Sequence, residues 1–122
     1  MKNLENLITS PIKKFTVTTN HTNNSNALLS NVLFNEMEHF SKDVINKQTH
    51  IASPNPQLYK LQILKNAHLG DCLLLKSQIK KLNQSELQLV VVAAIEKKTG
   101  ENIICKAIFK FSLKDYNISK AS

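Results

Sequence analysis

The chain has 122 residues, a hydrophobic fraction of 42% and a formal charge of +7, so we expect one globular domain over residues 1–122. No apolar run approaches the roughly 20 residues that span a bilayer, and the N-terminus lacks the apolar stretch of a signal peptide, which predicts a cytoplasmic protein without membrane association. All 16 basic residues are lysines, and they are scattered along the chain. Proteins that bind nucleic acid sequence-specifically rely on arginine, so nucleic acid is a poor candidate ligand. The positive charge instead indicates a solvated surface, an anionic ligand or an acidic partner.

The first half of the chain predicts a strand, a polar loop and one long helix. Phe15, Val17 and Thr19 alternate with polar residues, which indicates a strand over residues 12–19. Seven polar residues, 20–26, follow and favour loop and cap conformations. Residues 27–45 contain neither Gly nor Pro, and apolar residues recur there every three or four positions as one helical stripe. The stripe consists of Leu29, Leu33, Met37, Phe40 and Val44.

After Pro56 the sequence predicts only strands. Alternating residues mark a first strand at 59–63, and a turn containing Gly70 precedes a second at 72–82. Two more strands, 87–96 and 102–112, are joined by a tight hairpin that contains Gly100. Five residues of the last strand are expected to share one face: Ile103, Cys105, Ala107, Phe109 and Phe111.

The strand at 87–96 is apolar on both faces, so it must be covered on both sides. One helix covers only one face of a five-stranded sheet. A second subunit is the simplest cover for the remaining apolar surface, either by abutting sheets or by pairing edge strands. We therefore expect a homodimer or a dimer of dimers.

Two cysteines, Cys72 and Cys105, lie inside apolar segments and are predicted to be reduced core residues, because no export signal points to an oxidising compartment. No group of His, Cys and Asp residues has the spacing of metal ligands. We therefore predict neither a metal site nor a cofactor.

The order of one strand, one long helix and four strands resembles the hotdog superfamily of acyl-CoA thioesterases and acyl-carrier-protein dehydratases. Three local features support the resemblance: two motifs, and the length and spacing of the last three strands, which match the family's antiparallel meander. The stretch 21–38, HTNNSNALLSNVLFNEME, is similar to a thioesterase segment that runs from a polar D-T-N/D-x-x-G loop into a helix ending in M-D/E or F-E-E. The stretch 67–73, AHLGDCL, is similar to the turn P-V-x-x-G-D-x-L. The resemblance covers residues 12–113 and implies an α+β fold in which a five-stranded antiparallel sheet wraps one central helix.

The resemblance also implies an activity, hydrolysis of an acyl-CoA or acyl-carrier-protein thioester in the manner of a 4-hydroxybenzoyl-CoA thioesterase. Coenzyme A would then be part of the substrate and not a separate cofactor. By position, Glu38 matches the acid that one thioesterase branch carries on the helix as base or nucleophile. The backbone N–H groups of Ser30, Asn31 and Val32 match the donors that polarise the thioester carbonyl.

Other positions leave two alternatives open. Glu36 lies one position from the acid of the dehydratases, which act on 3-hydroxyacyl thioesters, and His21 or a neighbour corresponds roughly to their loop histidine. Asn23 stands where a second thioesterase branch has its catalytic aspartate, and an amide is not a base. Asn26 and the pair Ser30-Asn31 replace glycines that let the backbone approach the thioester closely. These departures favour a hotdog module that binds an acyl ligand or coenzyme A without turning it over.

Lysines near the strand ends are the candidates for binding the phosphates of coenzyme A, because Lys binds phosphate as a point charge. The candidates are Lys76, Lys80 and Lys97. A solvated strand edge is the alternative account of these lysines.

Overall fold

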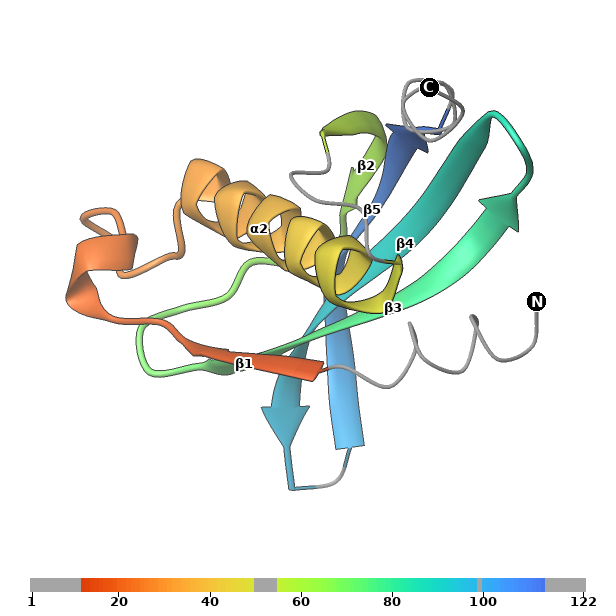
Figure 1. Ribbon diagram of the computed structural model, residues 1–122. Coiled ribbons are helices and arrows are strands. Elements are labelled where there is room, and N and C mark those ends of the chain that lie inside the picture. The colour runs from red at the N-terminus through yellow and green to blue at the C-terminus, as the bar shows by residue number, and fades with distance from the viewer. Residues whose placement is uncertain (1–11, 50–54, 99, 114–122) are drawn as a thin grey trace.

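The computed structural model describes residues 12–49, 55–98 and 100–113. They form one antiparallel sheet with the strand order β1-β3-β4-β5-β2, and one long helix lies across one face of that sheet (Figure 1). The predicted arrangement of five strands around one helix is therefore confirmed. In chain order the elements are β1 (Ile12–Thr16), η1 (Thr19–His21), α2 (Ser30–Thr49), β2 (Pro56–Ile63), β3 (Cys72–Leu82), β4 (Glu86–Lys97) and β5 (Gly100–Ser112).

The boundaries of α2 differ from the prediction at both ends. The helix begins at Ser30 and not at residue 27, because Ala27 and Leu28 are held in extended bridges to His68 and Thr22. At the other end the helix continues past Ile45, the last residue of the predicted helix, to Thr49.

The order and type of the five strands and the long helix agree with the prediction. Two strand ends differ most: β1 ends at Thr16 and not at residue 19, because Thr19 belongs to the short helix η1, which was not predicted, and β2 begins at Pro56 and not at residue 59.

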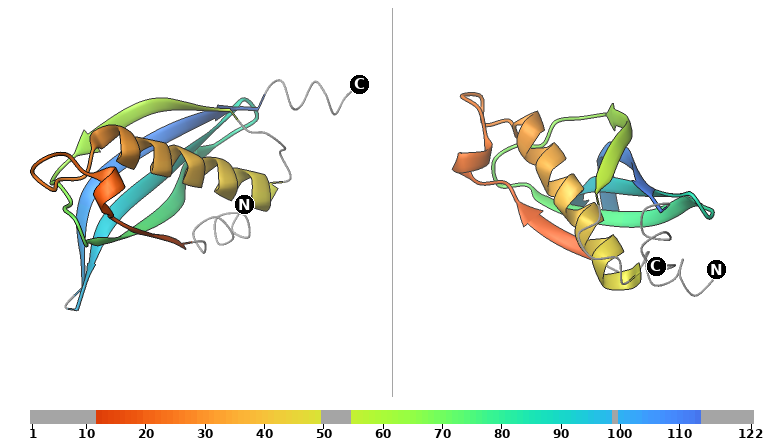
Figure 2. Two further views of the ribbon diagram at one scale, coloured as in Figure 1. Left: turned by 90° about the vertical axis from the view of Figure 1, so that its left-hand side faces the viewer. Right: turned by 45° about the horizontal axis from the view of Figure 1, so that its top comes forward.

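The hydrophobic core lies between α2 and the inner face of the sheet, which curls around the helix (Figure 2). Four members of the predicted stripe are buried there, and the fifth, Leu29, precedes the helix. On β4 the residues that face the helix alternate with residues that face outward, as the pleat of a strand requires. The largest fully buried side chains include Phe109, Phe111 and Met37.

A bulge in the β4–β5 pairing corrects one prediction for the last strand. Ala93 pairs with Cys105 while Ala94 pairs with Ile103, so Ile104 is the extra residue between the two pairs. Ile104 is buried in the core as a result, and Ile103, predicted to lie on the core face, is 39% exposed. The other four residues predicted for that face are buried: Cys105, Ala107, Phe109 and Phe111.

One edge of the sheet is long and apolar. The edge strand β2 has eight residues, and nearly all of them are exposed on both faces. Its large exposed apolar residues are Leu58, Tyr59, Leu61 and Ile63. An exposed apolar edge of this length is typical of a surface that pairs with another chain.

Both cysteines are free, as predicted, but only Cys105 is fully buried, and Cys72 is partly buried. Burial raises the pKa of the Cys105 thiol from its ordinary value of 9.0 to about 11. The low polarity around the thiol disfavours the charged thiolate in the folded state.

We expect the protein to lose stability relative to a Cys105→Ala variant as the pH rises from about 9 towards about 11. The folded pKa is raised, so the stability linked to the protonated thiol is fully present below the unfolded pKa and is lost as the pH passes through the folded value. Urea unfolding of both proteins at about pH 8 and about pH 10.5 measures the change, because all other titrating groups are common to the pair. An unchanged difference between the two proteins would contradict the prediction.

Across the described residues, no helix combines the length and the apolar character that crossing a membrane requires. In the same part of the chain, no group of three or more His, Cys, Asp and Glu side chains is arranged to hold a metal ion.

Candidate active site

The two stretches that carry the sequence resemblance lie side by side at the start of α2. The N–H of Leu28 donates to the carbonyl of Ala67, and the N–H of Leu69 donates to the carbonyl of Asn26, each at 2.8 Å. Asn26 has a φ of 62°, a left-handed conformation that glycine adopts freely and that asparagine tolerates better than most residues. Asn26 therefore adopts a backbone conformation that the glycine of the similar motif would also allow.

Asn23 is oriented by its own loop. Its side-chain oxygen Oδ1 accepts the backbone N–H of Ser25 at 2.8 Å and that of Ala27 at 3.1 Å. Because both bonds use the oxygen, the side-chain NH₂ group remains as a donor, and the residue is exposed. Asn23 is therefore a positioned hydrogen-bond donor.

His21 caps the short helix η1. Its Nδ1 accepts the backbone N–H of Thr18 at 3.1 Å and lies 3.0 Å from the hydroxyl of the same threonine. The imidazole packs against Phe15, with 4.8 Å between the ring centroids. Since Nδ1 is an acceptor, the neutral ring carries its proton on Nε2.

The start of α2 offers unpaired backbone donors. The N–H of Leu33 donates to the carbonyl of Leu29 at 3.2 Å, so the three N–H groups before it, those of Ser30, Asn31 and Val32, have no acceptor within the helix. The first turn contains no acidic residue, so no side chain of that turn neutralises the positive end of the helix dipole. This end of the helix favours a negatively charged oxygen.

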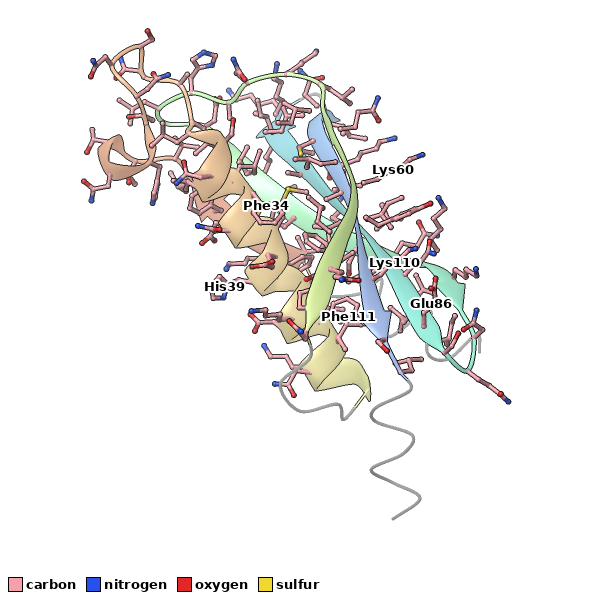
Figure 3. All side chains as sticks on the ribbon, turned by 90° about the horizontal axis from the view of Figure 1, so that it is seen from above. Phe34, His39, Lys60, Glu86, Lys110 and Phe111 are labelled. Atoms are coloured by element: carbon pink, nitrogen blue, oxygen red, sulfur yellow. The ribbon has the colours of Figure 1, made fainter. Side chains whose placement is uncertain are left out.

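Glu38 lies on the flank of α2 that faces β5 and β2. Phe34, one turn earlier, contacts Phe109 of β5, with 6.1 Å between the ring centroids, and Figure 3 shows Phe34 between the helix and the sheet. Residues four apart share a helix face, so Glu38 shares this flank. Its side chain is partly buried, and among the described residues no ion pair or hydrogen bond engages its carboxylate.

Glu36 lies on the opposite flank, towards the other edge of the sheet. Its carboxylate forms an ion pair with Lys13 of β1, with 3.1 Å between Nζ and Oε1. The structure therefore separates the two candidate acids, one towards each edge strand. His21 and Glu36 each have a structural partner of their own.

A residue that the sequence did not single out supports the Glu38 flank. Ser41 is fully buried, and its hydroxyl donates to the backbone carbonyl of Glu38 at 2.7 Å. The signal for this residue was a polar side chain beside the apolar stripe, one turn after Glu38 and two turns after Phe34.

The three candidate phosphate ligands lie apart from these groups. Lys76 and Lys80 alternate with core residues on β3, so they lie on the face of the sheet away from α2. Lys76 is paired with Glu101, with 2.7 Å between Nζ and Oε1, and Lys97 is exposed at the end of β4. Within one chain these lysines do not surround Glu38, and their role towards coenzyme A stays a prediction.

No protein-family model matches the sequence, and no curated protein matches it, so the similarity to known proteins is structural. The acyl-CoA hydrolase of Staphylococcus aureus, solved with butyryl coenzyme A and coenzyme A, has a TM-score of 0.77 and 16% identity, covering 84% of this chain and 63% of that one. Zebrafish thioesterase superfamily member 2 has a TM-score of 0.72 and 17% identity, covering 84% of this chain and 72% of that one.

A third similar structure is the hexameric thioesterase y2039 of Yersinia pestis, with a TM-score of 0.69 and 14% identity over 82% of this chain and 83% of that one. The present chain spans less than two thirds of the length of the S. aureus hydrolase. These comparisons establish that the chain has the hotdog fold, as the sequence predicted.

Proposed function

We propose that the protein is a thioesterase that hydrolyses acyl-CoA, with Glu38 as base or nucleophile. The observation that carries the proposal is the state of Glu38, a partly buried carboxylate without an ion-pair partner on the flank of α2 that faces β2. A carboxylate not engaged by a cation is available to take a proton or to attack a carbonyl carbon.

The spacing of Asn23 and Glu38 supports the same proposal. The S. aureus hydrolase was solved as alanine variants of an asparagine and of an aspartate that lie fifteen positions apart in its chain. Asn23 and Glu38 are also fifteen positions apart, since 38 − 23 = 15. An asparagine and an acidic residue at this separation are thus common to both chains.

In the proposed reaction, the carboxylate of Glu38 takes a proton from water, and the resulting hydroxide attacks the thioester carbonyl carbon. Direct attack by the carboxylate, followed by hydrolysis of the mixed anhydride, is the second route. The backbone N–H groups at the start of α2 and the NH₂ group of Asn23 would donate to the carbonyl oxygen as it becomes negative. The carbon–sulfur bond then breaks, and coenzyme A leaves as a thiol after protonation.

The distance along α2 favours a site that combines groups from two protomers. Val32 and Glu38 are six residues apart on the same helix, which at 1.5 Å per residue is about 9 Å. The N–H group must lie roughly 3 Å from the carbonyl oxygen, and the carboxylate roughly 3 Å from the attacking water or from the carbonyl carbon. We therefore propose that Glu38 of one protomer acts with the helix start of a second protomer.

The edge strand β2 is the proposed contact between the protomers. It has unpaired backbone groups on its outer side and exposed apolar residues beside the flank that carries Glu38. Pairing two copies of β2 would cover these residues and continue the sheet across the dimer. A dimer of dimers, a cytoplasmic location and acyl-carrier proteins as alternative acyl donors belong to the same proposal.

Replacing Leu61 with glutamate is expected to weaken the dimer at least about tenfold, because it places a charge on the apolar edge. Leu69→Glu is the matched control, since both leucines are 42% exposed but Leu69 lies in the turn before β3. Sedimentation over a range of micromolar concentrations measures both variants. A monomeric native protein, or equal weakening by the two substitutions, would argue against β2 as the interface.

The function is tested by incubating the native protein with acyl-CoA substrates of different chain length and measuring the release of free thiol. Turnover of at least one substrate is expected. Tight binding of coenzyme A or acyl-CoA without release of thiol would instead favour the non-catalytic module, which the side chains of Asn26, Ser30 and Asn31 favour. The dehydratase alternative has no specific contact in its favour, because the groups it needs are paired with Lys13 and Thr18.

A further inference from the structure

The face of the sheet away from α2 contains a hollow with three lysines around an apolar floor. Its volume is about 520 Å³, and its lysines are Lys60 of β2, Lys80 of β3 and Lys106 of β5. The floor is formed by Val90 and Ile108, which are direct partners in the β4–β5 ladder. Figure 3 shows Lys60 on this side of the sheet, away from the helix.

The register of the strands explains why these residues meet. Lys60 pairs with Ile108, Ile108 pairs with Val90, and Val90 pairs with Gln78, so one row of side chains crosses four strands on this face. Lys106 lies in the next row along β5, and Lys80 lies two residues after Gln78 on β3. Long basic side chains therefore stand on both sides of the two β-branched residues.

Other lysines of this face have partners. Lys14 pairs with Glu96 at 3.9 Å, and Lys76 pairs with Glu101. A further lysine, Lys110, lies 3.9 Å above the ring of Tyr59.

Glu86, whose carboxylate lies near Lys110, also has a hydrogen-bond partner. Glu86 accepts a hydrogen bond from the side chain of Gln88 at 2.6 Å. This bond, followed by the charges of Lys110 and Lys81, lowers the pKa of Glu86.

The three lysines of the hollow differ from these neighbours. Within the described residues, Lys60, Lys80 and Lys106 have no carboxylate or other hydrogen-bond partner. Three like charges around one depression repel one another, and a multiply charged anion would relieve that repulsion.

The size and composition of the hollow decide between occupants. A second copy of the chain packed on this face would oppose lysine with lysine, which like-charge repulsion disfavours. A protein partner usually anchors on Trp, Tyr or Arg, and the lining contains none of these residues. The volume lies within the range of small-molecule sites, about 300–1,000 Å³.

We propose that this hollow is a binding site for the phosphorylated part of a nucleotide, with phosphates on Lys60, Lys80 and Lys106 and the base on Val90 and Ile108. Two ligands carry such a group: a free nucleotide and coenzyme A, through its nucleotide end. The site lies across the sheet from Glu38, and the binding itself does not depend on thioesterase activity.

Titration calorimetry with ADP tests the proposal on the full chain. The native protein is expected to bind one ADP per chain, and the double variant Lys80→Gln/Lys106→Gln is expected to bind it at least about tenfold more weakly. Lys42→Gln/Lys98→Gln removes the same charge elsewhere and is expected to change the affinity less than about twofold. No saturable binding of ADP, or equal weakening in the two double variants, would overturn the proposal.

A competition experiment with coenzyme A shows whether the hollow binds a free nucleotide or the nucleotide end of coenzyme A. If the hollow holds the nucleotide end of coenzyme A, ADP and coenzyme A compete, and the Lys80→Gln/Lys106→Gln variant binds both more weakly. If the ligand is a free nucleotide, ADP binds with undiminished affinity to protein saturated with coenzyme A. Either outcome supports the site, and a protein that binds ADP there without hydrolysing any thioester would refute only the proposed function.

Discussion

Glu38→Gln is expected to lower the rate of acyl-CoA hydrolysis by at least about 100-fold, because glutamine keeps the shape of the side chain but cannot take a proton from water or attack the carbonyl carbon. The backbone of the helix is expected to be unaffected, since Ser41 binds the main-chain carbonyl of residue 38 and not its side chain. Release of free thiol from the best acyl-CoA substrate measures kcat. Binding of coenzyme A should change much less than kcat.

Glu36→Gln is the matched control, two residues away on the opposite flank of α2. It removes the ion pair with Lys13, whose carboxylate and ammonium groups are both partly exposed. Such pairs stabilise proteins by roughly 0–1 kcal/mol, so hydrolysis should stay within about threefold of the native rate. Full activity of Glu38→Gln, or equal losses in both variants, would show that Glu38 is not the catalytic acid. Dehydration of a 3-hydroxyacyl thioester that needs Glu36 and His21 would support the dehydratase instead.

Phe109→Ala is expected to reduce the free energy of unfolding by about 3–5 kcal/mol, the usual cost of removing a buried aromatic side chain and leaving a cavity. Phe109 is completely buried, contacts Phe34 of α2 and pairs with Leu89 and Leu58 on the neighbouring strands. The substitution therefore loosens the contact between the helix and the half of the sheet beside Glu38. Urea denaturation followed by circular dichroism measures the change.

Ile108→Ala is the control for this prediction, because it shortens the neighbouring side chain on the outer face of the same strand. Ile108 is only partly buried, so the expected loss is below about 1.5 kcal/mol. Similar losses for the two variants would mean that the packing between α2 and β5 is not the main source of stability in this region.

The local patterns of the sequence were sufficient to predict the five strands and the long helix, but not the short helix η1. The stripe from Leu33 to Val44 repeats at the helical period, and strands β3, β4 and β5 carry runs of apolar residues bounded by turns. Gly70 and Gly100 both have positive φ, 92° and 134°, which agrees with their predicted places in a turn and a hairpin. These features depend on residues close together in the chain, so the sequence shows them directly.

The sequence could not predict features that depend on pairing between distant residues. The bulge at Ala93 and Ala94 exchanges the places of Ile103 and Ile104, and alternation within β5 alone contains no sign of it. The partners of the surface lysines are equally non-local, since Lys76 meets Glu101 across two strands and twenty-five positions.

For the candidate site, the sequence by itself determined which residues are available and that Glu36 and Glu38 lie on different sides of one helix. Only the tertiary structure decided which of the two residues faces β1 and which faces β2. Because β1 and β2 occupy opposite edges of the sheet, Glu36 meets Lys13 while Glu38 faces the exposed edge strand without a cation. The helical period fixes the angle between two side chains, but the strand order, formed by hydrogen bonds between residues far apart in the chain, decides what each of them contacts.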